Sequence, residues 1–211
     1  MSDLDVVGFD VYGTLFDITG EDWAAPEVVA AARSKQLQYS WLVSLMGAYR
    51  PFRDLTRAAV ENALAVHGAH ADVDRVMEAM LHIRPYPEMA AALESIARSA
   101  RLAVLSNGDP ESLEALLANA GVRDRFEWVI SADEVRVYKP APAVYQRLLD
   151  RTGAARERVL FVSSNGFDVA GAAAFGLRVA WVNRRGAPPE GVGGRPEIDV
   201  RDLTQLAGRL S

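Results

Sequence analysis

Four short polar stretches carry the residue types that could do chemistry. They are Asp10-Val11-Tyr12-Gly13-Thr14, Ser106-Asn107-Gly108, Lys139-Pro140 and the stretch from Ser163 to Asp168. Each supplies a carboxylate, hydroxyl, amide or ammonium group, and three of them directly follow a short apolar run. The four stretches are far apart in the chain, so a site forms only if the fold brings them together.

The charged groups in these stretches have complementary roles. Asp10 lies at a glycine-assisted turn, where a carboxylate can point outward as a nucleophile. Lys139 is a fixed positive charge that would favour the ionised form of a nearby Asp10. Asp168 is a second carboxylate, available as a base, as an orienter of Lys139 or as a metal ligand. Singly, each could be an ordinary turn or surface residue, but together they predict a site.

The stretch around Ser106 and Asn107 is expected to meet an anion. After Gly108 the chain continues with Asp109 and Pro110, which are typical of a helix N-cap and a first helical residue. Backbone N–H groups at a helix start attract negative charge. We therefore expect this turn to face a bound anionic group.

Five short runs rich in β-branched residues predict the elements that position these groups. Buried parallel strands are expected over 6–9, 102–105, 128–130, 159–162 and 179–182. Helical stretches such as 110–120 and 141–152 alternate with them, which is typical of an α/β fold with a Rossmann-like, doubly wound parallel sheet. In such a sheet ligands bind beyond the carboxyl ends of the strands, where the four polar stretches are expected.

The interval between the first two strands has helical periodicity instead. Pro26 can begin a helix, and apolar residues recur after it; 53–66 and 72–82 show the same pattern. We therefore expect residues 21–84 to form an all-helical cap, inserted into a catalytic core of residues 1–20 and 85–211. A Gly/Pro-rich loop over 186–196 is expected before a last short strand and a helix over 202–209.

Composition excludes several classes of protein. The chain has 211 residues, 50% hydrophobic and 24% charged, with a net charge of −5 and no cysteine. The lack of cysteine excludes a disulfide scaffold, a thiol nucleophile and cysteine-ligated zinc. The acidic balance disfavours nucleic acid as a partner. No apolar run is long enough for a membrane span, and the acidic start lacks a signal-peptide pattern, so we expect a cytoplasmic protein.

The four polar stretches resemble the motifs of the haloacid dehalogenase superfamily, and more narrowly those of the L-2-haloacid dehalogenases. The likeness rests on Asp-x-Tyr-Gly-Thr-Leu-Phe-Asp (10–17), Leu-Ser-Asn-Gly (105–108), Tyr-Lys-Pro (138–140), Ser-Ser-Asn-x-x-Asp (163–168) and the cap stretches 33–39 and 41–49. It implies hydrolysis of short L-2-haloalkanoic acids to D-2-hydroxy acids through an ester on Asp10. It implies water as co-substrate, halide as product and no metal or other cofactor. A homodimer through the cap helices would fit the resemblance.

The resemblance also implies roles for individual residues. Arg33 and Asn107 would receive the halide, and Ser106 with neighbouring backbone amides would hold the substrate carboxylate. Lys139 would pair with Asp10. The residues implied to position Asp10, Lys139 and the hydrolytic water are Thr14, Tyr145, Ser163, Asn165 and Asp168. The residues implied to line the substrate pocket are Val11, Tyr12, Leu37, Phe52 and Phe167.

Two alternatives remain open at this point. Magnesium-dependent phosphatases of the superfamily carry a second aspartate two residues after the nucleophile, where this chain has Tyr12. A tyrosine, with a pKa near ~10, is a poor proton carrier at neutral pH, whereas a halide leaving group needs no proton. Ser163, Ser164 and Asn165 also offer fewer carboxylates than a Mg²⁺ site favours. The other alternative is a non-catalytic protein that binds a small anion.

Overall fold

The computed structural model describes residues 4–19 and 22–210, and its core is a six-stranded parallel sheet. The strand order is β3-β2-β1-β4-β5-β6, so β1 lies near the centre. The strands are β1 (Val6–Phe9), β2 (Arg101–Ser106), β3 (Trp128–Ser131), β4 (Val159–Ser163), β5 (Arg178–Val182) and β6 (Ile198–Val200). All neighbouring pairs are parallel, which confirms the predicted Rossmann-like architecture.

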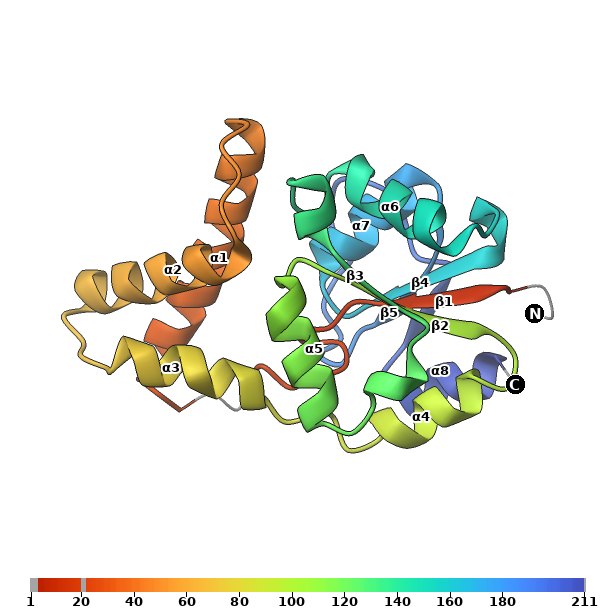
Figure 1. Ribbon diagram of the computed structural model, residues 1–211, viewed down its shortest axis with the longest axis horizontal. Coiled ribbons are helices and arrows are strands. Elements are labelled where there is room, and N and C mark those ends of the chain that lie inside the picture. The colour runs from red at the N-terminus through yellow and green to blue at the C-terminus, as the bar shows by residue number, and fades with distance from the viewer. Residues whose placement is uncertain (1–3, 20–21, 211) are drawn as a thin grey trace.

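Helices cover both faces of this sheet (Figure 1). On one face lie α4 (Met89–Ile96), α5 (Pro110–Asn119) and α8 (Leu203–Leu210), and on the other lie α6 (Pro142–Thr152) and α7 (Gly166–Phe175). Side chains alternate along a strand, so Val7 and Phe9 join the core beneath the first set of helices and Val6 joins the core beneath the second. Burial on both faces explains why the strands are continuous apolar runs in the sequence.

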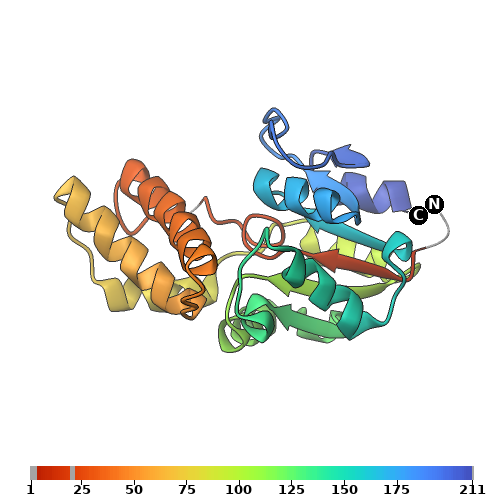
Figure 2. The ribbon, with the colours of Figure 1, turned by 90° about the horizontal axis from the view of Figure 1, so that it is seen from above.

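The cap consists of α1 (Pro26–Leu45), α2 (Phe52–His67), α3 (Val73–Ala79) and the short 3₁₀ helix η1 (Met80–His82). These helices stand to one side of the sheet (Figures 1 and 2). They enclose a small apolar core of their own, which includes Val28, Ala32 and Val60. The inserted all-helical cap is thus present as predicted, although Glu21, the first residue expected in it, lies outside the described residues.

Both connections between cap and core run beside the end of β1. Asp17 N donates to Arg84 O (2.8 Å) and Tyr86 N donates to Leu15 O (3.0 Å). The outgoing and returning segments are therefore hydrogen-bonded to each other a few residues from Asp10. A change in the position of the cap would act directly on the turn that carries Asp10.

Two parts of the sequence-based description differ from the structure. The helix expected over 72–82 is α-helical only to Ala79 and then tightens into η1. The apolar period of α1 overestimates its burial, since Leu42, Leu45 and Met46 are 42%, 86% and 65% exposed. One side of the second half of α1 contacts the core, where Val43 is buried and Ser44 Oγ accepts from Tyr138 N (3.1 Å), whereas the side that carries Leu42, Leu45 and Met46 is not covered. This part of α1 also rises above α2 (Figure 1).

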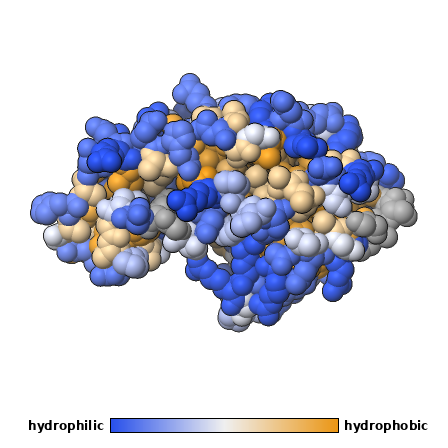
Figure 3. All heavy atoms as spheres, turned by 90° about the horizontal axis from the view of Figure 1, so that it is seen from below, coloured by the Kyte–Doolittle hydropathy of each residue, from blue (hydrophilic) through white to orange (hydrophobic). Residues whose placement is uncertain are grey.

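The surface is mixed in character. The face drawn in Figure 3 carries hydrophilic side chains over most of its outline, with apolar surface scattered between them, as is usual for a folded domain. Among the helices of residues 4–19 and 22–210, none is both long and apolar enough to cross a bilayer.

Candidate active site

Asp10 is the first residue after β1, and its carboxylate is held by three donors. Its Oδ1 accepts from Lys139 Nζ (3.0 Å), and its Oδ2 accepts from Thr14 Oγ1 (2.9 Å) and Asn165 Nδ2 (2.8 Å). Asp10 is only 5% exposed. Hydrogen bonds to a charged partner are short and directional, so the carboxylate has one fixed orientation.

Register explains why donors from distant segments reach Asp10. Phe9 of β1 is level with Val104 of β2 and Val162 of β4. Parallel strands in this register end at the same edge, so the residues after β1, β2 and β4 emerge side by side. The prediction that the polar stretches meet at one sheet edge is confirmed for Asp10, Lys139 and the stretch after β4.

Lys139 bridges two buried carboxylates. Its Nζ lies 2.9 Å from Asp168 Oδ2 as well as 3.0 Å from Asp10 Oδ1. Burial alone would lower the pKa of Lys139, but the carboxylates of Asp10 and Asp168 raise this pKa above its ordinary value of 10.5. Lys139 therefore carries its charge throughout the neutral range and neutralises the pair of acids around it.

Asp168 has a second donor on its other side. The Tyr145 hydroxyl donates to Asp168 Oδ1 at 2.8 Å, and both residues are fully buried. Burial raises the pKa of Asp168, and the opposing attraction of Lys139 does not cancel this effect. Burial also raises the pKa of Tyr145, so its hydroxyl keeps its proton and acts as a donor. The hydrogen-bonded chain Tyr145–Asp168–Lys139–Asp10 runs through the base of the site.

The turn after β1 is interlocked with the turn after β4. Thr14 Oγ1 accepts from Ser164 N (2.8 Å), while Asn165 Nδ2 donates to Tyr12 O (3.0 Å) as well as to Asp10. Ser163 Oγ accepts from Asn165 N (3.1 Å) and so orients Asn165. The positioning residues inferred from the resemblance therefore contact one another around the nucleophile.

The turn after β2 was expected to offer the backbone amides at the start of a helix to an anion, but two of these amides bind side chains of the protein itself. Ser106 Oγ accepts from Gly108 N (3.2 Å), and Asp109 Oδ2 accepts from Ser112 N (3.3 Å), so these two amides are already bonded within the protein. The Ser106 hydroxyl proton is left to donate. Asn107 Oδ1 accepts from Lys139 N (3.0 Å), which directs its Nδ2 end away from that partner and leaves it as a donor.

Aromatic side chains line the space above these groups. The Tyr12 and Phe52 ring centroids lie 6.3 Å apart, and Phe167 meets Trp41 edge-on at 5.6 Å. A Cβ on Gly108 would lie 3.0 Å from the Tyr12 hydroxyl, so glycine at this position makes room for the ring. The pocket walls thus come from both cap and core.

Arg33 and Leu37 lie one helical turn apart on α1 and line the same cleft, of about 590 Å³, which also reaches Asn165. This agrees with the sequence-based expectation that the two share a pocket wall. Val11 is different, because its side chain is fully buried in the core beneath the sheet. Only the main chain of Val11 can face a substrate.

Sequence reasoning missed Arg184. Its Nη2 donates to Thr14 O (3.2 Å) and its Nη1 pairs with Glu88 Oε1 (2.7 Å), while the guanidinium lies 3.4 Å from the centre of the Tyr86 ring. Arg184 comes two residues after β5. A search for polar residues just after β5, as was made after the other strands, would therefore have found Arg184.

The titratable residues of the described chain, 4–19 and 22–210, include no group of three or more His, Asp or Glu that could hold a metal ion. The two buried carboxylates of the site, Asp10 and Asp168, have the ammonium group of Lys139 between them. The fold and the site together define an α/β protein with a candidate aspartate nucleophile beneath a helical cap.

Known proteins with this combination are similar along nearly the whole chain. A model of the haloacid dehalogenase-like hydrolases matches residues 4–176. (S)-2-haloacid dehalogenase 2 of Pseudomonas sp. (strain CBS-3) is 40% identical, covering 100% of this chain and 97% of that protein. Haloacetate dehalogenase H-2 of Moraxella sp. (strain B) is 37% identical, covering 95% of each.

A solved structure is similar to this chain as well. It is the L-2-haloacid dehalogenase of Xanthobacter autotrophicus with chloropropionic acid covalently bound, which matches with a TM-score of 0.89, 36% identity and 97% coverage of both chains. The chain described here belongs to the haloacid dehalogenase-like hydrolase family.

Proposed function

We propose that this protein is a hydrolase acting on carbon–halide bonds, which converts short L-2-haloalkanoic acids into D-2-hydroxy acids without a metal ion. The observation that carries the proposal is the Asp10 carboxylate, held by Lys139, Thr14 and Asn165 at the carboxyl end of β1. Tyr12, rather than a carboxylic acid, stands two residues further on, which suits a leaving group that departs as an anion. The names of the relatives support this substrate class.

In the first step Asp10 attacks C2 of the substrate. We assign the attack to Oδ1, because Oδ2 then keeps its two donors, Thr14 and Asn165, for the negative charge that forms in the second step. The new C–O bond forms as the C–halogen bond breaks, the halide leaves with the bonding pair, and attack from the opposite side inverts C2. The product of this step is an ester of Asp10. The chloropropionic acid bound covalently in the Xanthobacter enzyme is consistent with such an intermediate.

In the second step water attacks the carboxyl carbon of that ester. Asp168 is the proposed base, because burial raises its pKa and Lys139 and Tyr145 hold it in place. Thr14 and Asn165 donate to the oxygen that gains negative charge in the tetrahedral intermediate. Asp168 passes the proton that it took from the water to the departing oxygen of the hydroxy acid. The second proton of the water is released to solvent, which restores Asp10 as a carboxylate.

The remaining site residues bind the two ends of the substrate. Arg33 on the cap and the Nδ2 group of Asn107 are the proposed halide partners, and the Ser106 hydroxyl is the proposed partner of the substrate carboxylate. The proposed pocket walls exclude bulk water and leave the nucleophile less solvated. They are Tyr12, Leu37, Phe52 and Phe167, with the main chain of Val11 at the base.

We also propose that residues 21–84 act as a separate cap domain and that two copies associate through it. The support is the exposed end of α1, where Leu42, Leu45 and Met46 form an apolar surface. Light scattering should give the mass of a dimer for the wild type and of a monomer for Leu45→Glu. Equal masses for the wild type and Leu45→Glu would overturn the proposal of a dimer through this surface.

The experiment that tests the proposed activity is halide release from L- and D-2-chloropropionate, measured separately in EDTA. The proposal predicts release from the L form alone, and none from either form with Asp10→Asn. Phosphate-ester hydrolysis that needs Mg²⁺, without halide release, would favour the phosphatase alternative. Anion binding without turnover of either kind would favour a binding protein.

A further inference from the structure

A small cavity lies beneath the cap, next to Tyr12. It has a volume of about 40 Å³, and we call it the cap cavity. Its boundary includes Tyr12, Arg33, Phe52, Met77, Met80 and Ile83. A water molecule takes up about 30 Å³ in the liquid, so the cavity has room for one or two carbon atoms.

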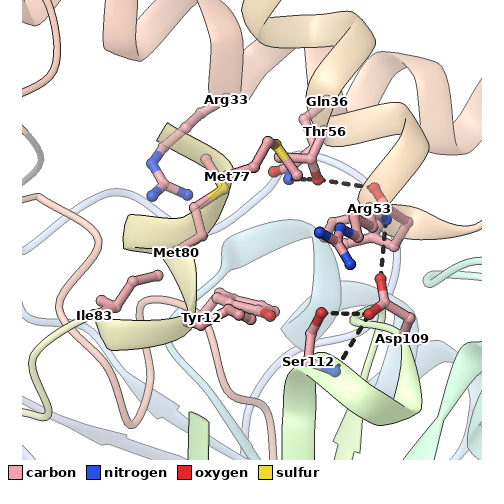
Figure 4. A pocket seen from close by; sticks show the side chains of 12 residues that line it. Tyr12, Arg33, Gln36, Arg53, Thr56, Met77, Met80, Ile83, Asp109 and Ser112 are labelled. Atoms are coloured by element: carbon pink, nitrogen blue, oxygen red, sulfur yellow. Dashed lines mark hydrogen bonds between the residues drawn. The ribbon is translucent and has the colours of Figure 1, made fainter. Parts of the chain in front are cut away.

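The cap cavity shares its walls with the proposed substrate pocket. Arg33 lines both the cap cavity and the cleft that reaches Asn165, and Tyr12 and Phe52, which line the cap cavity, are proposed walls of the substrate pocket. Tyr12 is two residues from the nucleophile. In Figure 4 Arg33 comes down from α1, Tyr12 lies opposite it, and Met77 and Met80 lie between the two. A substituent on C2 that is longer than methyl would therefore extend past Tyr12 toward the two methionines.

Several polar groups around the cavity bond to one another. Gln36 Nε2 donates to Thr56 Oγ1 (2.6 Å), and Thr56 Oγ1 donates to Phe52 O (2.8 Å). On the core side, Asp109 accepts from Arg53 N (3.0 Å) and also caps α5 (Figure 4). Because these groups already have partners, the surface left to a ligand is that of the aromatic and methionine side chains, with the side chains of Arg33 and Arg53 at the edge of the cavity.

The methionines suit an alkyl chain of variable length. Met77 is 6% exposed and Met80 is partly buried, so both face the interior. Methionine is unbranched and flexible, and it adjusts to the shape of the apolar group beside it. Ile83 completes this apolar wall at the point where the cap returns to the core.

We infer that the cap cavity is a subsite for the alkyl chain of 2-haloalkanoic acids longer than propionate, and that Met77, Met80 and Ile83 set the length that is accepted. This inference rests on the proposed dehalogenase activity and deepens it. The carboxylate and halogen would be bound as described above, and only the chain from C3 onward would enter the cavity.

The test compares kcat/KM for L-2-chloropropionate and L-2-chlorobutanoate, whose chain from C3 onward has two carbon atoms and so matches the volume of the cavity. Met80→Phe, which fills the cavity, should lower kcat/KM for the longer acid about tenfold or more, because a hydrophobic pocket discriminates by roughly 10–200-fold per methylene. The value for the shorter acid should stay within about twofold. Met80→Ala, which enlarges the cavity, should shift the ratio the other way. Val66→Phe adds the same ring at an exposed position of α2 and should change neither value.

An unchanged ratio of the two kcat/KM values in both Met80 variants would overturn the inference. A thermal unfolding transition shows whether Met80→Phe is folded. If it is not, the ratio of the two kcat/KM values in Met80→Ala decides. A rise of this ratio in favour of the longer acid supports the subsite, and no rise overturns it. Failure of the wild type to release halide from either acid would overturn the proposed function itself. Turnover of L-2-chloropropionate with an unchanged ratio would overturn the subsite alone.

Discussion

Arg184 donates a 3.2 Å hydrogen bond from Nη2 to the carbonyl oxygen of Thr14. Thr14 in turn donates from its side chain to Asp10 Oδ2. Arg184 also pairs with Glu88 and stacks on Tyr86, both of which follow the return of the chain from the cap. One side chain thus ties the turn of the nucleophile to the connection between cap and core.

Replacing Arg184 should therefore affect both stability and turnover. Arg184→Ala leaves the half-buried Glu88 without this charged partner, and the expected loss is about 1–3 kcal/mol in the free energy of unfolding. We also expect kcat for halide release to fall more than KM rises, because the Thr14 main chain loses a donor while the substrate contacts remain. The neighbouring exposed Arg185→Ala is the control and should leave urea unfolding and kcat unchanged. Equal effects of the two variants would contradict this role.

Asp109 links the cap to the core by capping two helices at once. Its Oδ1 accepts from Arg53 N in the first turn of α2, and its Oδ2 accepts from Ser112 N in the first turn of α5. Loss of an N-cap costs about 0.5–2 kcal/mol. Asp109→Ala should therefore lower the free energy of unfolding by that amount or more, whereas Asp109→Asn keeps an acceptor for one of the two amides and should lose less. Urea unfolding measures both, and equal losses would show that capping is not the cause.

Lys139 should be essential, and its charge should persist to high pH. Lys139→Met leaves Asp10 and Asp168 buried without a cation, a loss expected to cost about 3–5 kcal/mol of stability and to abolish turnover. Because the folded pKa of Lys139 is raised, its stabilising contribution is fully present below 10.5 and is lost only as the pH rises through the higher folded value.

The pH dependence of halide release checks whether the pKa of Lys139 is raised. Deprotonation of Lys139 should cause no fall in kcat/KM between about pH 8 and pH 10, where an unperturbed lysine would begin to lose its charge. A fall in that interval that Lys139→Arg removes would contradict a raised pKa.

Tyr145 should matter for the second step of the reaction rather than the first. Tyr145→Phe removes the donor to Asp168 Oδ1, and an unsatisfied buried acceptor costs about 1–3 kcal/mol. A displaced Asp168 is a poorer base, so the ester on Asp10 should accumulate during turnover. Mass spectrometry of rapidly quenched protein should show the added mass of the acyl group. Slower halide release without accumulation would place the effect in the first step.

The sequence predicts the parts of this molecule that depend on local pattern. Buried strands appear as apolar runs, and β1 (Val6–Phe9) has the predicted bounds. Pro26 begins α1, and Asp109 with Pro110 begins α5, because both signals act within one turn of a helix. The polar residues after β1 and β4 could be placed at one edge, since parallel strands bring their ends together.

Contacts between cap and core could not be predicted in the same way. The bond from Trp41 Nε1 to Lys139 O (3.2 Å), and the second role of Asp109, depend on how the cap is seated on the core. No periodicity in the sequence encodes that placement. The same is true of the exposed end of α1, where Leu45 continues an apolar pattern but has no neighbour to cover it.

The most direct test of the account is a single turnover of L-2-chloropropionate in H₂¹⁸O with enzyme in excess. Water that attacks the carboxyl carbon of an Asp10 ester leaves its oxygen in Asp10. The account therefore predicts ¹⁸O in the peptide that contains Asp10 and none in the 2-hydroxypropionate released. Label in the product after the first turnover, with an unlabelled Asp10, would show direct attack of water on C2 and would contradict the ester mechanism.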